Sequence, residues 1–262
     1  MIFKSNAKIN IGLHVKNKRS DGYHNIESVF YPIPLLDSIE IIESKNLEFY
    51  SKKIKINELD NLIIDAFHLI RKHYKIPNLT ITIDKNIPLG AGLGGGSSNA
   101  AFTLIALNQL FNLNLSKQEL VDFALELGSD CPFFIHNTPS IVFGRGEILK
   151  STSFNLKDKY IKLVNPKIHI STKKAFQELN TKNKAPAISE SLLLNDNWHH
   201  YLKNDFEAGI VNEFPAIGKS LQALKNEGAY FASLSGTGSS IFGLFQKRPV
   251  LKNIENEMVF KL

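Results

Sequence analysis

The stretch "NIPLGAGLGGGSSNAAFTLIAL", residues Asn86–Leu107, places a run of glycines and two serines directly before a long apolar segment. Glycines let backbone N–H groups approach a ligand closely, and the N-terminus of a helix presents free N–H groups and the positive end of its dipole. The pattern therefore predicts a phosphate-binding loop that opens a helix over residues 97–111. The alternative is a flexible turn with an ordinary serine cap.

This loop fits neither of two common nucleotide-binding patterns. Gly90, Gly92 and Gly95 satisfy GxGxxG, but the loop does not follow a first strand, and no strand with an acidic tip follows the helix. A Walker A loop needs a lysine where Ser97 stands. The positive charge that a bound phosphate requires must therefore come from another part of the chain.

Two residues outside the loop could complete a site for phosphoryl transfer. Polar and apolar residues alternate over residues 7–16, which predicts a strand with one core face and puts Lys8 and Asn10 on the other face. Asp130 lies in "LELGSDCPFFIH". Phosphoryl transfer to an alcohol needs a cation near the transferring group and a carboxylate that takes the hydroxyl proton. Lys8 and Asp130 are the candidates. The alternatives are a surface lysine and a helix capped by Ser129 or Asp130.

Helical and strand-like segments are mixed along the chain without regular βαβ repeats, which indicates an α+β protein. The length favours two domains, residues 1–150 and 151–262. Strands are predicted in residues 7–16, 26–33, 38–44, 47–51, 79–87, 140–149, 160–165, 231–245 (around a glycine-rich turn) and 259–262, and helices in residues 61–74, 97–111, 116–127, 172–179 and 216–228.

Charge and composition limit the classes of partner that the protein is expected to bind. The net charge of +6 suits anionic ligands, but only four of the 31 basic residues are arginines and the lysines are scattered, which disfavours nucleic acid. The sequence shows neither a signal peptide nor an apolar run long enough to span a membrane. With Cys131 as the single cysteine, we expect a cytoplasmic protein that acts on a phosphorylated small molecule and binds neither nucleic acid nor membrane.

Two glycine-rich motifs carry a family resemblance. "PxxxGLGGGSSxAA", from Pro88 to Ala101, and "LSGTGSSIFGLF", from Leu234 to Phe245, resemble those of the GHMP kinases, named for galactokinase, homoserine, mevalonate and phosphomevalonate kinases. The resemblance implies an α+β, two-domain GHMP kinase fold. Its N-terminal, ATP-binding domain would contain a left-handed βαβ crossover, and its C-terminal domain would be a ferredoxin-like α/β sandwich.

Further motifs narrow the implied substrate. "AKINIGLHVKNKRSDGYHNIESVF" (residues 7–30), "DNLI" (60–63) and "LGSDCPFFI" (127–135) are similar to those of members of the non-mevalonate isoprenoid pathway. The expected reaction is ATP-dependent phosphorylation of the 2-hydroxyl of 4-diphosphocytidyl-2-C-methyl-D-erythritol, with Mg²⁺ carried on ATP. A homoserine or mevalonate kinase that uses the same loop is the second hypothesis, and a nucleic-acid-binding module without activity is the third.

The resemblance also implies roles for individual residues. Lys8 would orient and stabilise the reacting groups, and Asp130 would deprotonate the acceptor hydroxyl. Tyr23 and Phe176 would sandwich the cytosine, although Phe176 could instead pack in the core with Leu179. The implied ATP-binding residues are Asn61, Lys85, Pro88, Leu89, Gly90, Ala91, Gly92, Leu93, Gly94, Gly95, Gly96, Ser97 and Ser98. The implied substrate-binding residues are Asn10, Tyr23, His24, Phe176, Gly236 and Gly238.

The chain departs from the family pattern in places. Asn99 stands where many relatives carry aspartate, and no metal-binding carboxylate can be located in a helix that faces the phosphates, so no residue is assigned to a metal. The stretch "NTKNKAPAISESLLLNDNWHHYL" (residues 180–202) matches no motif, and residues 178–205 are assigned no role. His199 and His200, beside Trp198, are interpreted as a solvated pair rather than as metal ligands, because no third ligand has a suitable spacing.

Overall fold

The computed structural model describes residues 1–54, 56, 61–179, 186–251 and 256–262. The contacts divide the chain into two compact units. Unit 1 consists of Met1–Ala7, Leu35–Leu89 and Gly94–Thr138, and unit 2 of Lys8–Pro34, Gly90–Leu93 and Pro139–Leu262. These units interleave along the chain, so the domain boundary expected near residue 150 stays a prediction. Asp60 of the "DNLI" motif and residues 180–185 of the unmatched segment lie outside the described residues.

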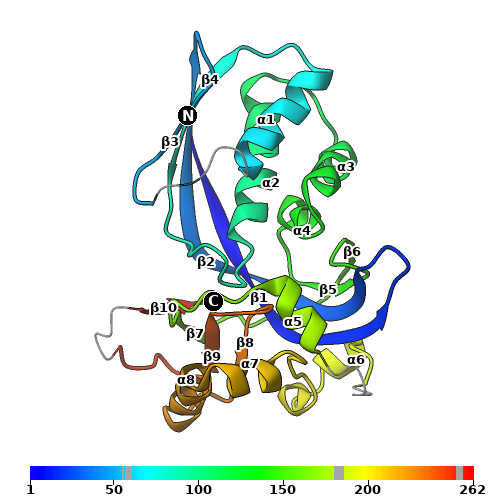
Figure 1. Cartoon of the computed structure of the whole chain (residues 1–262), viewed down its shortest axis with the longest axis vertical. Helices are drawn as coiled ribbons and strands as arrows, with labels where there is room; N and C mark the ends of the chain where they lie inside the picture. Colours follow the sequence, from blue (N-terminus) through cyan, green and yellow to red (C-terminus); the bar gives the residue numbers. More distant parts are fainter. Residues whose placement is uncertain (55, 57–60, 180–185, 252–255) are drawn as a thin grey trace. The chain divides into compact units, whose positions relative to one another are not determined.

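Unit 1 packs helices against strands. Its parallel pair, β3 with β4, is joined through helix α1, which gives a βαβ unit of the kind that the resemblance implies. On β4 the side chains of Leu79, Ile81 and Ile83 are buried, and the helices gather together beside the strands (Figure 1). The helices are α1 (Leu62–His73), α2 (Gly95–Leu110), α3 (Lys117–Leu127) and α4 (Cys131–His136), and the strands are β3 (Glu48–Ser51), β4 (Asn78–Asp84) and parts of β1 (Ile2–Lys18) and β2 (His24–Ser44).

The glycine loop leads into α2 as predicted, but the start of the helix differs. The N-cap residue is Gly94, whose backbone is left-handed with φ +68°, and no side chain caps the helix. The serine-cap alternative is therefore wrong. Small buried residues such as Ala100 and Ala101 let α2 lie deep among the other helices, where it makes extensive contacts with α1. The predicted capping box of the next helix is confirmed between Ser116 and Glu119.

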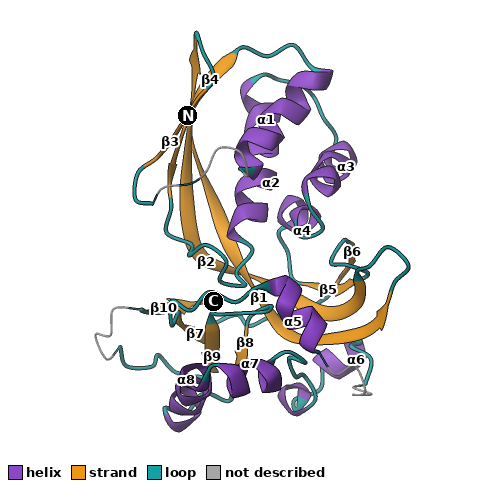
Figure 2. Ribbon diagram, viewed as in Figure 1, coloured by secondary structure: helices purple, strands orange, loops and turns teal. Residues whose placement is uncertain are grey.

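Unit 2 contains a sheet of four antiparallel strands in the order β10-β7-β9-β8. Counted in chain order this is fourth, first, third, second, the ferredoxin-like arrangement. Figure 2 shows this sheet with its helices. The strands are β7 (Tyr160–Val164), β8 (Phe231–Leu234), β9 (Ile241–Phe245) and β10 (Glu257–Lys261), and the helices are α5 (Thr172–Glu178), α6 (Glu190–Leu193), the 3-10 helix Trp198–His200, α7 (Glu207–Glu213) and α8 (Pro215–Asn226).

Three strand predictions need correction. The two strands predicted over residues 26–33 and 38–44 are one continuous strand, β2. Residues 140–149 form a hairpin of β5 (Ser140–Phe143) and β6 (Ile148–Ser151) rather than one strand, because Gly144 (φ +69°) and Gly146 (φ +121°) turn the chain. The first strand is buried on both faces from Ser5 to Val15 rather than on one. Asn204 forms a bridge with Leu13, and Leu202 lies against Gly12, so a distant segment of the same unit covers the second face.

The burial of His14 predicts a dependence of stability on pH. Burial lowers the pKa of its imidazole below the ordinary 6.5, although the charge of Asp205 opposes this. The unfolded chain then binds the proton first, so the stabilisation is complete above pH 6.5 and is lost as the pH falls below it. We expect the free energy of unfolding to decrease as the pH falls below 6.5. His14→Gln should reduce this slope, as measured by urea titration; an unchanged slope would assign it to other groups, such as His136.

Candidate active site

Lys8 lies inside unit 2, on β1. Its side chain is buried, and its Nζ donates to Asn10 Oδ1 at 2.6 Å and to the carbonyl of Gly92 at 3.4 Å. The ammonium also lies 4.5 Å from the ring centroid of Phe30. The alternative of a solvated surface lysine is therefore wrong, and the alternation of β1 correctly placed Lys8 and Asn10 on one face.

A late glycine-rich turn meets the phosphate loop at the same point of unit 2. Ser235 donates its hydroxyl to the carbonyl of Gly92 at 2.9 Å, and the N–H of Asn10 donates to Ser235 Oγ at 3.3 Å. A Cβ added to Gly92, at φ +75°, would lie 1.9 Å from the Ser235 carbonyl oxygen. A Cβ on Gly236 would lie 3.5 Å from Asn10 Oδ1. The predicted residues Lys8, Asn10, Gly92 and Gly236 thus form one cluster, whereas Gly238 borders Ile170 and Leu234.

The loop presents mainly its backbone. The side chains of Ala91 and Leu93 are buried, so these residues can offer a ligand only their main chain. In unit 1, Ser98 is fully buried, and its hydroxyl donates to the carbonyl of Asn6 at 2.6 Å. Its N–H donates to the Gly94 carbonyl at 2.8 Å. No side chain caps the first turn of α2, so the N–H groups there are suited to an anion.

Two predicted ATP-binding residues of unit 1 have different environments. Asn61 caps α1 by accepting from the N–H of Ile63 at 3.0 Å, and its buried Nδ2 has no hydrogen-bond partner among the described residues. An unpaired buried donor is costly, so this group is suited to an acceptor on a ligand. Lys85 is buried and ion-paired with Asp37. Burial lowers the pKa of Lys85, and the Asp37 carboxylate raises it.

Asp130 occupies the N-cap position of α4, directly before Cys131 and Pro132. Its backbone is already helical, and its side chain makes no capping hydrogen bond. The helix-capping interpretation of this carboxylate is therefore wrong. The neighbouring thiol is unsuited to chemistry, because burial raises the pKa of Cys131 to about 12. The role of Asp130 as general base stays a prediction.

The aromatic residues expected around the cytosine lie in unit 2. Phe176 stacks on His24 with ring centroids 5.1 Å apart and an angle of 21° between the rings, and its other neighbour is Phe206 at 4.7 Å. Tyr23 is 57% exposed, with the guanidinium of Arg145 5.0 Å from its ring centroid. Phe176 therefore lies beside the "DGYH" turn, and it also packs against the hydrophobic cluster that contains Phe206.

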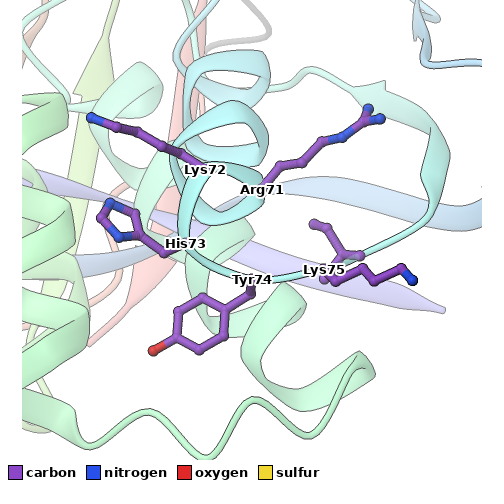
Figure 3. Close-up of a pocket in the computed structure, with 6 residues that line it drawn as sticks. Arg71, Lys72, His73, Tyr74 and Lys75 are labelled. Carbon is purple, nitrogen blue, oxygen red and sulfur yellow. The ribbon is translucent and has the colours of Figure 1, made fainter.

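In the described part of the chain, no group of three His, Cys, Asp or Glu side chains could hold a metal ion. The rings of His199 and His200 lie 4.1 Å apart in an aromatic cluster with Trp198 and Tyr230. A hollow of about 440 Å³ at the end of α1 contains none of the predicted residues (Figure 3); it is lined by Arg71, Lys72, His73, Tyr74, Lys75 and Ile76.

Sequence reasoning missed two polar residues of these clusters. Ser235 stands in the motif "LSGTGSSIFGLF", of which only the glycines were predicted to contribute to the site. Its hydroxyl, directly before Gly236, could have indicated a hydrogen bond at this turn. Asp37 is an acidic residue within the apolar run "YPIPLLDSIEI", a pattern that indicates a buried and paired carboxylate. The sequence does not indicate its partners, which lie about 50 and 60 residues away.

The GHMP kinases N terminal domain matches residues 61–138, and the GHMP kinases C terminal domain matches residues 186–262. A relative from Azobacteroides pseudotrichonymphae is 46% identical over 257 residues, which is 95% of this chain and 96% of the relative. The chain belongs to the GHMP kinase family. It is a small-molecule kinase of mixed α/β structure with two sheets, as the motifs predicted.

The relatives of this GHMP kinase carry consistent names. The Azobacteroides protein and one from Bacteroides thetaiotaomicron, 42% identical over 96% of this chain and 94% of the relative, are both named 4-diphosphocytidyl-2-C-methyl-D-erythritol kinase. A crystal structure of 4-(cytidine 5'-diphospho)-2C-methyl-D-erythritol kinase has a TM-score of 0.81 and 27% identity, and the match covers 93% of this chain and 90% of that one. Mevalonate kinase from Methanococcus jannaschii, at 16% identity and a TM-score of 0.64, shares the fold over 99% of this chain and 96% of that one.

Proposed function

We propose that this GHMP kinase transfers the γ-phosphoryl group of ATP to the 2-hydroxyl of 4-diphosphocytidyl-2-C-methyl-D-erythritol. The observation that carries the proposal is the cluster of Lys8, Asn10, Gly92 and Ser235, in which a buried ammonium lies against the carbonyl of the glycine loop. A buried lysine with polar partners is expensive to maintain for stability alone. The name shared by the relatives supports the choice of substrate.

In the proposed reaction, the Asp130 carboxylate accepts the proton of the 2-hydroxyl. The hydroxyl oxygen then bonds to the γ-phosphorus, the bond from that phosphorus to the bridging oxygen breaks, and ADP leaves with the electron pair. The Lys8 ammonium stabilises the negative charge of the transferring group. Both residues act mainly in the transition state, so their effect is expected in kcat rather than in the KM for ATP.

ATP and the acceptor use different sets of residues. The uncapped N-terminus of α2 is suited to the nucleotide, as is the Nδ2 of Asn61, which has no partner among the described residues; the backbone of residues 88–97 contributes further N–H groups. Asn10, Gly236 and the rings of the "DGYH" turn with Phe176 are assigned to the acceptor. Magnesium would arrive with ATP and would neutralise part of the charge of its phosphates. Among the described residues, no group of three His, Cys, Asp or Glu side chains could hold a metal ion.

One assay separates this proposal from its alternatives. The purified protein is incubated with ATP and 4-diphosphocytidyl-2-C-methyl-D-erythritol, and ADP is measured, with mevalonate and homoserine as parallel acceptors. The proposal requires ADP release with the cytidyl acceptor and little with the other two. Faster release with mevalonate or homoserine would identify a different kinase of the family.

Removal of either aromatic ring should weaken binding of the acceptor. Stacking contributes about 1–3 kcal/mol per base, so we expect Tyr23→Ala and Phe176→Ala each to raise the KM for the acceptor roughly 5- to 150-fold. The KM for ATP should stay the same. The double variant should lose less than the product of the two effects, because one remaining ring holds the base poorly. Steady-state kinetics with each substrate varied in turn measures the KM for ATP and for the acceptor in the two single variants and the double variant.

Controls for the ring variants come from the same chain. Tyr23→Phe keeps the ring and should retain most of the affinity, and Tyr50→Ala removes an equally exposed tyrosine of unit 1 without effect on the acceptor. If Phe176→Ala lowers the melting temperature but leaves the KM for the acceptor unchanged, Phe176 belongs to the core, and another aromatic residue must stack on the cytosine.

The proposed location is the cytoplasm, with small molecules rather than nucleic acid or membranes as partners. Cys131 is a buried free thiol, which suits a reducing compartment. Within the residues described, no helix has the length and apolar character needed to cross a membrane. Fractionation of cells that express the tagged protein tests this location.

A further inference from the structure

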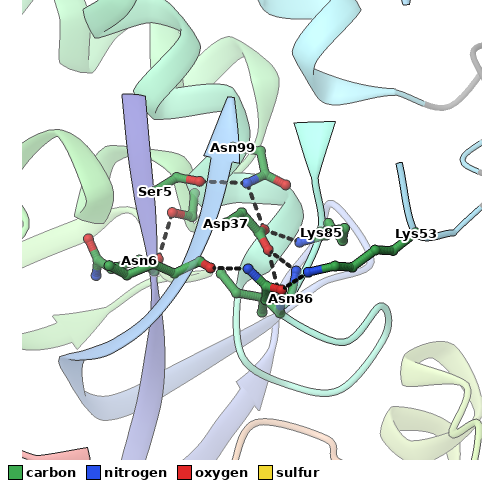
Figure 4. A network of polar contacts seen from close by, with 10 residues as sticks. Ser5, Asn6, Asp37, Lys53, Lys85, Asn86 and Asn99 are labelled. Carbon is green, nitrogen blue, oxygen red and sulfur yellow. Dashed lines mark hydrogen bonds and ion pairs between the residues drawn. The ribbon is translucent and has the colours of Figure 1, made fainter. Parts of the chain in front are cut away.

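Asp37 is a fully buried carboxylate of unit 1 that the proposed mechanism does not use. It lies on β2 and binds groups from two other segments (Figure 4). Its Oδ1 accepts from the N–H groups of Asn86 at 2.6 Å and Ile87 at 2.8 Å. Its Oδ2 pairs with the ammonium of Lys85 and accepts from Asn99 Nδ2 at 2.9 Å. A carboxylate without access to water must have its acceptor sites satisfied in this way.

These partners flank the glycine loop in the chain. Residues 85–87 directly precede Pro88, and Asn99 directly follows Ser98, so one carboxylate holds both ends of the segment 88–98. A second attachment lies on β1, where Ser5 Oγ accepts from Asn99 at 2.8 Å. A segment whose ends are fixed has less conformational freedom to lose when it binds a ligand. The network therefore prepares the loop before the nucleotide arrives.

Lys85 connects this network to the N-terminus of α2. A Cβ added to Gly95, the first residue of the helix, would lie 2.9 Å from Lys85 Nζ, so the ammonium lies directly against that residue. The N-terminus of a helix carries a positive partial charge, and a second positive charge beside it is unfavourable without an anion. Asp37 supplies that anion. Without Asp37, the buried ammonium would be left uncompensated at the point where the phosphates are expected.

We propose that Asp37 is a positioning residue for ATP. It holds the first turn of α2 and residues 85–87 in the geometry that binds the phosphates, and it acts through Lys85, Asn86, Ile87 and Asn99 rather than by touching the nucleotide. This inference rests on the proposed function, in which ATP is the phosphoryl donor.

The first test is Asp37→Asn, which keeps the size of the side chain but removes its charge. Binding of ATP is measured by calorimetry without the acceptor, and the KM of each substrate is measured in the steady state. We expect ATP to bind roughly 10- to 100-fold more weakly, the scale of loss that small displacements in a site produce, while the KM for the acceptor stays the same.

Ile41→Ala is the matched control for lost stability. Ile41 is buried four residues further along the same strand, so its truncation leaves a cavity in unit 1 without touching the network. This variant should melt earlier than the wild type and bind ATP as well as the wild type does. The comparison separates a positioning role from a general loss of stability.

Exchange of the charge between positions 37 and 99 tests the positioning role, because a purely structural role would not predict recovery of ATP binding. The double variant Asp37→Asn/Asn99→Asp returns one negative charge to the same buried place, and we expect it to recover most of the affinity for ATP that Asp37→Asn loses. Asn99→Asp alone places two carboxylates together and should weaken ATP binding. Recovery of this kind is a coupling between neighbours, which independent destabilising changes do not show.

The outcomes are decisive. An Asp37→Asn protein that binds ATP as tightly as Ile41→Ala does, or a double variant no better than the single one, overturns the inference. If Asp37→Asn does not fold, Asn99→Ala takes its place, with an expected loss of about 3- to 10-fold in ATP affinity; unchanged binding would contradict the proposal. A wild-type protein that binds no ATP overturns the proposed function itself, and with it this inference.

Discussion

Replacement of Asp130 by asparagine is expected to lower kcat by roughly 10²- to 10⁴-fold, the usual contribution of a general base, with little change in the KM for ATP. The asparagine keeps the shape of the side chain but cannot accept the hydroxyl proton. Since the Asp130 side chain makes no capping hydrogen bond with α4, its loss should not unfold the helix. Steady-state kinetics and a melting curve on the same preparation measure both quantities.

Lys8→Ala should reduce kcat by a similar factor, because the ammonium stabilises charge that develops during transfer. The double variant Lys8→Ala/Asp130→Asn should lose much less than the product of the two single losses, since residues that act as a unit are not additive. Lys16→Ala, from the same strand, is the control and should leave kcat unchanged. Strictly multiplicative losses would contradict joint action, and an Asp130→Asn protein that turns over normally but melts early would give this carboxylate a structural role.

Gly92→Ala is expected to have the other large effect, a loss of at least about 10²-fold in kcat/KM, which is what a displacement of about 1 Å in a site can cost. The new methyl group would lie 1.9 Å from the Ser235 carbonyl oxygen, and the backbone of residue 92 has φ +75°. The loop and the late turn cannot both keep their positions, so Lys8 loses its contact with the Gly92 carbonyl. Kinetic assays and a melting curve measure the damage.

Gly209→Ala is the control for Gly92→Ala, because it makes the same change at a glycine with space for a side chain. Gly209 lies in α7 with ordinary helical backbone angles, and no atom lies within 4 Å of an added Cβ. Alanine should therefore be tolerated there or stabilise the helix by up to about 1 kcal/mol. A Gly92→Ala enzyme with the wild-type kcat/KM would show that the close approach to Ser235 is not needed for turnover.

Local patterns predicted the elements of the site well. The alternation over residues 7–16 gave both the strand and the shared face of Lys8 and Asn10, because side-chain direction in a strand depends only on the period of two. The same alternation predicted one buried face, whereas the structure buries both faces of this strand from Ser5 to Val15. What covers a face depends on segments far away in the chain, here Leu202 and Asn204, which no local period reveals.

The parts of the site that the sequence did not reveal are long-range pairings. The glycine loop can be recognised in the sequence because glycine permits backbone angles and close approaches that other residues do not. The cap of α3 can be recognised because Ser116 and Glu119 are three residues apart. The pairing of Asp37 with Lys85, and that of Ser235 with Gly92, join residues 48 and 143 positions apart. Similarly, Gly144 and Gly146 were treated as part of a strand, although their positive φ angles make a turn.

The interleaving of the two units has a consequence for synthesis on the ribosome. Unit 1 is complete once Thr138 has been made, so it can fold during translation. Residues Lys8–Pro34 belong to unit 2 and must wait for Pro139–Leu262, which are translated last. During that interval the first part of β2 lacks its partner strand β5, and the second part of β1 lacks the segment of Leu202 and Asn204 that lies against it, a state in which exposed strands favour aggregation. A chain truncated after residue 138 should therefore expose these strands and depend on chaperones for solubility.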